Sequence, residues 1–110
     1  MKIQTTQETL SLAVQSALRS VGAKSDTDLS GSLLFRLVET EQGKQLWIES
    51  FNKVSMAKVP LLGARIEPSL HTVFTVEATN LKDCLNAIPD KEAEIELTYD
   101  GKVTFRAKIS

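Results

Sequence analysis

Hydrophobic positions recur along this chain with two periods, one typical of helices and one typical of strands. Between residues 10 and 21 they make one helical stripe, formed by Leu10, Ala13, Val14, Ala17, Leu18 and Val21. Upstream, Thr5 and Glu8 fit a capping box, in which a hydroxyl and a carboxylate accept hydrogen bonds from the free amides of a helix start. We therefore predict a short strand over residues 1–5, followed by a helix that ends near Gly22.

The last third of the chain predicts a second helix and then a hairpin. Pro89 ends a second apolar stripe with helical spacing, formed by Leu81, Cys84, Leu85 and Ile88. Because Cys84 belongs to this stripe, we expect it to be buried as a small hydrophobic residue. Apolar and polar residues then alternate over 94–99 and 103–109, on either side of Asp100-Gly101. Such a pair is a strong hairpin signal, because a two-residue turn needs positive φ at both positions.

The middle of the chain alternates with the period of strands. The predicted strands there are 32–39, 44–51, 54–62, 64–68 and 71–78. The first two form a hairpin in which Trp47 and Phe51 face away from Leu46 and Ile48. Pro60 cannot donate a hydrogen bond to a neighbouring strand, so it indicates a sheet edge or a bulge.

These elements follow the order β-α-β-β-β-(β)-β-α-β-β, in which strands greatly outnumber helices. Two amphipathic helices among many strands predict the α+β class, with both helices packed on one face of antiparallel sheets. The order of strand, helix and hairpin occurs twice, which predicts an internal pseudo-two-fold repeat. A length of 110 residues suits a single domain that spans residues 1–110.

Composition narrows the function classes. The net charge of −1 excludes a domain that is basic all over, so any basic surface must be local. One cysteine excludes an internal disulfide and suits a reducing compartment. The N-terminal residues lack the apolar run of a secretory signal, and no stretch approaches the roughly 20 apolar residues of a membrane span. We therefore expect a cytoplasmic protein without membrane contact.

Residues for catalysis or metal binding are sparse. His71 is the only histidine and has no evident partner, so we expect a structural or incidental role. Glu92, Glu94 and Glu96 alternate as on a solvated strand face. The glycines are scattered at turns, which excludes a phosphate-binding loop, and no metal-ligand spacing occurs. We predict no catalytic residue, no cofactor and no metal site. A small enzyme that uses His71 and Cys84 is the weakest of three hypotheses.

Three basic residues have a shared geometric interest. Arg19 lies on the polar face of the first predicted helix, Lys24 follows the end of that helix, and Lys82 lies on the second helix. If both helices pack on the same face of the sheets, these residues line one surface. Basic side chains in such a place can contact phosphate, which fixes position without reading sequence. They are the candidate DNA-facing residues.

Four segments together resemble the first domain of the bacterial and phage DNA sliding clamp, the processivity subunit of the replicative polymerase. They are ETLSLAVQSALRSVG, the pattern SGSLLFRL…LWIES…SMAKVPL, FTVEATNLKDCLNAIPD and EIELTYDGKVTFRAK, and they cover essentially all of residues 1–110. The resemblance implies the DNA-clamp (processivity) fold and a non-enzymatic ring, with helices lining the hole and sheets outside. It further implies a domain that encircles duplex DNA, or contributes to encircling it, and tethers the polymerase. The implied partners are double-stranded DNA (bound weakly and without sequence specificity), DNA polymerase, the clamp loader, and other clamp domains or further copies.

Site residues follow the family pattern only in part. Lys24 matches a position that is often basic and faces DNA in the family. The positions of Thr79, Asn80 and Asn86 often hold Lys or Arg in the family, so weak contact with DNA is implied here.

The end of the chain also departs from the family. Family chains hold two or three such domains, whereas this one holds one and stops at Ser110, where a further strand is expected. We expect either the first domain of a longer clamp or a small clamp-like protein that assembles differently. In both cases the open edge should be the last strand, through Val103, Phe105, Ala107 and Ile109. The alternative function is a clamp-fold interaction or oligomerisation module, such as a phage or accessory protein, that does not tether DNA.

Overall fold

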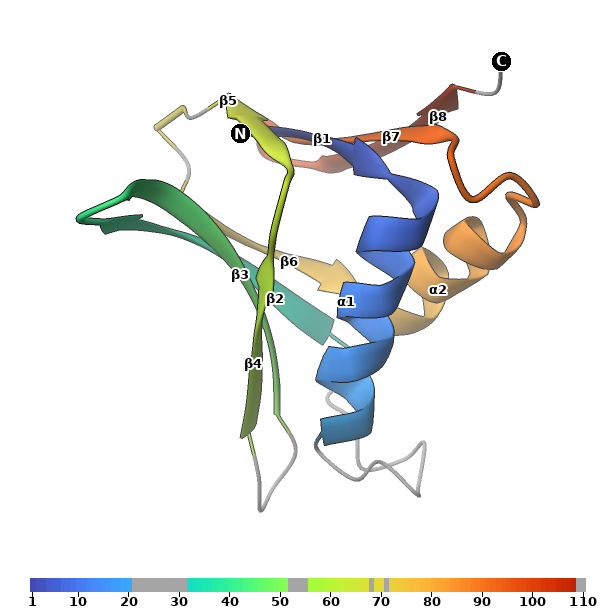
Figure 1. Cartoon of the computed structure of the whole chain (residues 1–110), viewed down its shortest axis with the longest axis horizontal. Coiled ribbons are helices and arrows are strands. Elements are labelled where there is room, and N and C mark those ends of the chain that lie inside the picture. Colours follow the sequence, from blue (N-terminus) through green and yellow to red (C-terminus); the bar gives the residue numbers. More distant parts are fainter. Residues whose placement is uncertain (21–31, 52–55, 68, 71, 109–110) are drawn as a thin grey trace.

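The computed structural model describes residues 1–20, 32–51, 56–67, 69–70 and 72–108 of the chain (Figure 1). Its elements are β1 (Lys2–Thr6), α1 (Gln7–Ser20), β2 (Ser32–Thr40), β3 (Gly43–Phe51), β4 (Met56–Leu61), β5 (Arg65–Glu67), β6 (Val73–Glu77), α2 (Ala78–Asn86), β7 (Glu94–Tyr99) and β8 (Val103–Lys108). This is the predicted order, and the predicted α+β class is confirmed. The predicted helix end at Gly22 lies outside the described residues.

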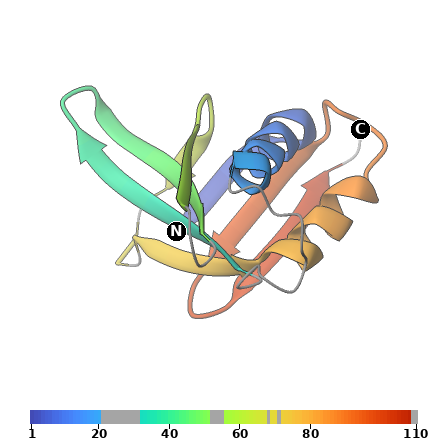
Figure 2. The ribbon, with the colours of Figure 1, turned by 90° about the horizontal axis from the view of Figure 1, so that it is seen from below.

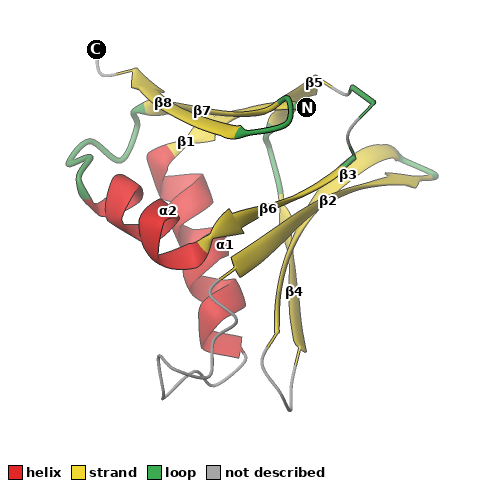
Figure 3. Cartoon of the chain, turned by 180° about the vertical axis from the view of Figure 1, so that it is seen from behind, coloured by secondary structure: helices red, strands yellow, loops and turns green. Residues whose placement is uncertain are grey.

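The strands form two antiparallel sheets of four strands each. Sheet A has the order β5-β1-β7-β8, and sheet B has the order β4-β3-β2-β6. Figures 1 and 3 show sheet A across the top of the molecule, with sheet B below it on one side and the two helices on the other. The two sheets and the helix pair therefore surround one core. Pro60 lies in β4 at an end of sheet B, as its missing amide donor predicts.

Strand pairing confirms the pseudo-two-fold repeat. In the first half β1 leads through α1 to the β2–β3 hairpin, and in the second half β6 leads through α2 to the β7–β8 hairpin. The leading strand of each half joins the hairpin of the other half, since β1 pairs with β7 and β6 pairs with β2. The halves differ at the sheet edges, where β5 also pairs with the second side of β1, whereas no described strand pairs with the second side of β6. In the first half, β4 pairs with the far side of β3, whereas in the described part of the second half, β8 is the last strand of sheet A.

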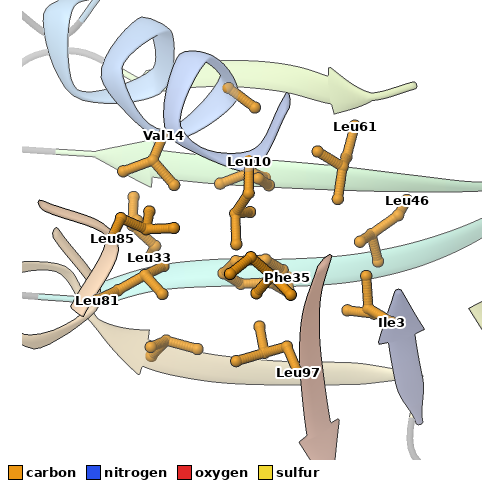
Figure 4. Close-up of a cluster of buried hydrophobic side chains, with 14 of the residues drawn as sticks. Ile3, Leu10, Val14, Leu33, Phe35, Leu46, Leu61, Leu81, Leu85 and Leu97 are labelled. Carbon is orange, nitrogen blue, oxygen red and sulfur yellow. The ribbon is translucent and has the colours of Figure 1, made fainter. Parts of the chain in front are cut away.

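Apolar side chains from both sheets and both helices meet in the core. Figure 4 shows this cluster, whose labelled members are Ile3, Leu10, Val14, Leu33, Phe35, Leu46, Leu61, Leu81, Leu85 and Leu97. The rings of Phe35, Phe74 and Tyr99 stack in sequence, with centroids 5.1 Å apart in both pairs. Tyr99 belongs to sheet A and the two phenylalanines belong to sheet B, so this stack joins the sheets across the core.

The start of α1 differs from the predicted capping box by one residue. The Thr9 backbone amide donates to Thr6 Oγ1 at 3.2 Å, so Thr6 caps the helix. Thr5 stays in β1, where it pairs with Ile95 of β7, and this pairing continues through Thr6. The box of Thr5 and Glu8 is therefore wrong, because strand pairing delays the helix start by one position.

The prediction that Cys84 is buried is also wrong. Leu81, Leu85 and Ile88 of the same predicted stripe are buried, whereas Cys84 is exposed. Successive helix residues lie about 100° apart around the axis. Cys84 therefore lies at the margin of the stripe, on the side away from the buried Ala78, where the core does not cover it.

The β7–β8 turn is longer than the predicted two-residue turn. Tyr99 pairs with Val103, so residues 100–102 form the loop. Gly101 has a φ of 106°, and within the described part of the chain only glycines have positive φ, so Asp100 does not. A three-residue loop requires positive φ at one position rather than two, which explains the difference.

Candidate nucleic-acid interface and association edge

Helices α1 and α2 pack against each other and present one outer surface (Figure 2). Two buried hydrogen bonds fix the position of α1. Gln7 Nε2 donates to the Leu85 carbonyl oxygen of α2 at 3.0 Å, and Ser50 Oγ of β3 donates to the Ala17 carbonyl oxygen at 2.6 Å. Because the groups are buried, losing one partner leaves the other without a compensating bond to water. The surface of the helix pair is thus held by polar bonds as well as by apolar packing.

A groove runs between the two helices on this surface. It is lined by Ser11, Val14, Gln15, Leu18, Lys82, Leu85 and Asn86. Lys82 therefore lies on the shared helix surface, where the sequence predicts it. Arg19 belongs to the last turn of α1, but its side chain lies outside the described part, and Lys24 is outside the described residues altogether. A common surface for all three basic residues stays a prediction.

The described part of the helix surface carries little charge. Lys82 is exposed, and the hydroxyl and amide side chains of Ser11, Gln15 and Asn86 line the same groove. The Gln15 Nε2 group donates to Ser11 Oγ at 3.3 Å. Leu12, which is 57% exposed, lies beside these residues, and the sequence did not single it out because it falls outside the apolar stripe. One ammonium group with neutral donors around it can hold a phosphate loosely, and it does not read base sequence.

Strand β8 forms the second candidate site. It pairs with β7 on one side and is the last strand of sheet A in the described part of the chain. Val103 and Phe105 are partly buried against the core, whereas Ala107 is exposed, and Ile109 lies outside the described residues. The backbone of β8, rather than its apolar side chains, is therefore what this edge offers to another chain.

An ion-pair network joins β5, β1 and β7 on the outer face of sheet A. Lys2 Nζ lies 3.1 Å from Glu96 Oε1 and 3.7 Å from Glu67 Oε2. The hydrogen bond and the charge of Glu96 raise the pKa of Lys2, and the hydrogen bond from Lys2 lowers the pKa of Glu96. Glu96 also stands directly opposite Arg106 of β8. This face is polar and charged, as the alternation of Glu94 and Glu96 predicts.

Only one of the two residues considered for catalysis lies in the described part of the chain. His71 lies outside the described residues, and Cys84 is an exposed residue of α2. Over the described ranges, His, Cys, Asp and Glu side chains form no group of three or more that could hold a metal ion. Within the same ranges, no helix has the length and apolar character to cross a bilayer.

The complete chain superposes on part of two solved structures. Against Caulobacter crescentus pol III beta the TM-score is 0.68 at 18% sequence identity, over 100% of this chain and 28% of that one. Against the DNA polymerase III subunit beta from Pseudomonas aeruginosa it is 0.66 at 23% identity, again over 100% of this chain and 28% of that one. The chain has a sliding-clamp domain fold. The predicted clamp fold is thus confirmed, with two helices on one side of two antiparallel sheets.

The likeness is one of structure. No protein-family model and no curated protein matches the sequence. This chain spans 28% of the length of each solved structure above, so it corresponds to one portion of a pol III beta chain. Structural similarity at this level of sequence identity establishes the fold but not the activity.

Proposed function

We propose that this clamp-fold domain acts as a non-enzymatic processivity factor, or as one domain of such a factor. It contributes to encircling duplex DNA and tethers a replicative polymerase in the cytoplasm. The observation that carries the proposal is the superposition of the entire chain on pol III beta structures, with both helices side by side on one surface.

The weak charge of the helix surface supports a topological link. A protein that holds DNA by tight phosphate contacts gains salt-dependent affinity with each contact, and such contacts would impede sliding. In the described part of the groove, Lys82 is the one basic side chain, and its neighbours are neutral donors such as Ser11 and Gln15. A ring that encloses the duplex needs no more than this, which also reconciles DNA binding with a net charge of −1. We assign the DNA-facing role to Lys82, together with Arg19 and Lys24.

Ring closure requires association, and we assign that role to the β8 edge. A strand with an unpaired side can accept a strand of another chain, and a heterologous contact repeated around an axis closes a ring. The single domain of residues 1–110 then acts either in several copies or as the first domain of a longer clamp. Polymerase and clamp loader are partners of the assembled ring.

Native mass spectrometry of the 110-residue chain over a range of concentrations tests this assignment. We expect oligomers for the wild type and a monomer for Ala107→Lys, which places a long charged side chain at the β8 edge. Thr72→Lys adds the same charge at an exposed position just before β6 and should leave the oligomer unchanged. A wild-type chain that stays monomeric at every concentration, with or without DNA, would contradict ring closure by this chain.

A second function is favoured by the same low charge. If the helix surface never meets DNA, the domain is a clamp-fold module for protein interaction or self-association. In that case oligomers form as above, but DNA retention does not depend on whether the DNA is circular or linear. Lys82→Glu then has no effect on any DNA-dependent measurement, whereas a DNA-facing Lys82 predicts weaker retention at low salt.

A further inference from the structure

The outer face of sheet B mixes apolar side chains with charged ones such as Arg36, Glu49 and Lys58, whereas the outer face of sheet A is polar throughout. Side chains alternate across a sheet, and Phe35, Leu46 and Ile48 point into the core, so the residues between them point outward. The outward residues that matter here are Leu34, Arg36, Val38, Trp47, Lys58 and Val73, which we call the sheet B face. The equivalent strands of sheet A present Lys2, Gln4, Glu96, Thr98, Arg106 and Lys108 outward.

The pseudo-two-fold repeat makes sheet A an internal reference. Strands β2, β3 and β6 correspond to β7, β8 and β1, and the sheet A strands fold with a fully polar outer face. The fold therefore does not require apolar residues on the outside of these strands. Val73 is 38% exposed, and Leu34, Val38 and Trp47 are only half-buried, so nothing in the described chain covers this face completely.

Two cations flank the indole of Trp47 at the centre of the sheet B face. Trp47 on β3 stands opposite Arg36 on β2, and the Lys58 ammonium of β4 lies 5.5 Å from the indole centroid on the other side. Arg36 Nε donates to Glu49 Oε2 at 2.7 Å, and the Glu49 side chain is only 11% exposed. That bond uses one of the five guanidinium N–H donors and leaves the Arg36 side chain 44% exposed. Both cations therefore keep donors that can take a further carboxylate.

We propose that the sheet B face binds a short segment of a partner protein that carries an aromatic or aliphatic anchor between carboxylates. The anchor packs on Trp47 and the neighbouring Leu34, and the carboxylates bind Lys58 and Arg36. Those two residues lie two strand spacings apart and are offset by two residues along the strands, which separates them by about 12 Å. Trp and Arg are also the residue types that most often dominate binding energy at protein interfaces.

The size and the charge of the face both favour this occupant over a second copy of the chain. Three strand spacings by four residues along a strand give about 14 Å by 14 Å, or on the order of 200 Å². A stable protein pair buries about 800 Å² on each partner. Two copies that met through this face would also bring Lys58 and Arg36 against the same cations of the other copy.

An NMR titration of the ¹⁵N-labelled 110-residue chain tests the proposal with two capped hexapeptides, DDLFDD and KKLFKK. Trp47 is the one tryptophan, so its indole N–H gives a single reporter signal. We expect DDLFDD to shift this signal and the amides of β2, β3 and β4 in a saturable way, and KKLFKK to leave them in place. Lys58→Glu should weaken DDLFDD binding by about tenfold or more, which corresponds to about 1.4 kcal/mol.

Arg65→Glu is the matched control, because it makes the same change of charge at an exposed position of β5 in sheet A. It should leave DDLFDD affinity within about twofold, and the amide spectrum of each variant reports whether it is folded. Equal shifts with both peptides, shifts that map to the helices or β8, or equal losses in the two variants would each overturn the proposal. An indole signal that moves with protein concentration in the absence of peptide would instead indicate a second copy and overturn it as well.

Discussion

The substitution Phe74→Leu tests whether the aromatic stack joins the two sheets. Phe74 is the middle ring, 3% exposed, and stacks on Phe35 on one side and on Tyr99 on the other. Each such pair contributes about 0.5–1.5 kcal/mol beyond the burial of area. Leucine keeps most of the apolar contact and loses both stacks, so the expected cost is about 1–3 kcal/mol of unfolding free energy. Domains of this size typically have a total of only about 5–15 kcal/mol.

The assay is thermal and urea unfolding followed by circular dichroism. For a domain of about 100 residues, 1 kcal/mol lowers Tm by about 4–8 °C, so Phe74→Leu should lower it by roughly 4–24 °C. Phe105→Leu is the control, since Phe105 is only partly buried and should cost less. A double-mutant cycle with Tyr99→Leu isolates the contact between sheets, with an expected coupling of about 0.5–1.5 kcal/mol. Effects that add to within about 0.3 kcal/mol would refute the stack as a link between the sheets.

Three further predictions concern smaller features. Thr6→Ala should lower the free energy of unfolding by about 1 kcal/mol, because it removes the α1 cap, and Thr5→Ala should lower it clearly less. Equal losses of unfolding free energy in urea would contradict the observed cap. Because Lys2 lowers the pKa of Glu96, the wild type should be more stable than Glu96→Gln above the ordinary carboxyl pKa of 4.5, and the difference should vanish as the pH falls through the lower pKa of the folded state. Melting temperatures measured across that range check the sign, and a difference that grows towards low pH is the contrary result. Cys84 should react fully with a maleimide in the folded chain without loss of secondary structure, and protection until unfolding would contradict its exposure.

Most elements of the fold could be predicted from the periodicity of the hydrophobic residues. Alternation predicted that Leu46 and Ile48 share one face of their strand, away from Trp47, and that Glu94 and Glu96 lie on the polar outside of β7. The repeated order of strand, helix and hairpin predicted the two-fold arrangement. The edge position of β4 could be predicted directly from Pro60, because the missing amide donor is a property of proline itself.

The wrong predictions for the α1 cap and for the burial of Cys84 have local causes. The capping residue of α1 depends on how far β1 pairs with β7, which is a tertiary fact absent from the Thr5–Glu8 spacing. The exposure of Cys84 depends on how wide an arc of α2 the core covers. For the candidate site, periodicity predicted that Lys82 lies on the helix surface, but it could not find the asymmetry between the outer faces of sheets A and B. That asymmetry appears only when cross-strand neighbours such as Trp47 and Arg36 are known.

Retention on DNA of defined topology tests the clamp function most directly. The chain, with any partner that its oligomeric state requires, is incubated with a nicked circular duplex, separated from free protein by gel filtration, and the DNA is then cut once. The proposed function predicts that protein co-elutes with the circle and is released on cutting, because the free ends let a ring slide off. Equal retention on cut and uncut DNA, or no retention on either, would contradict the account.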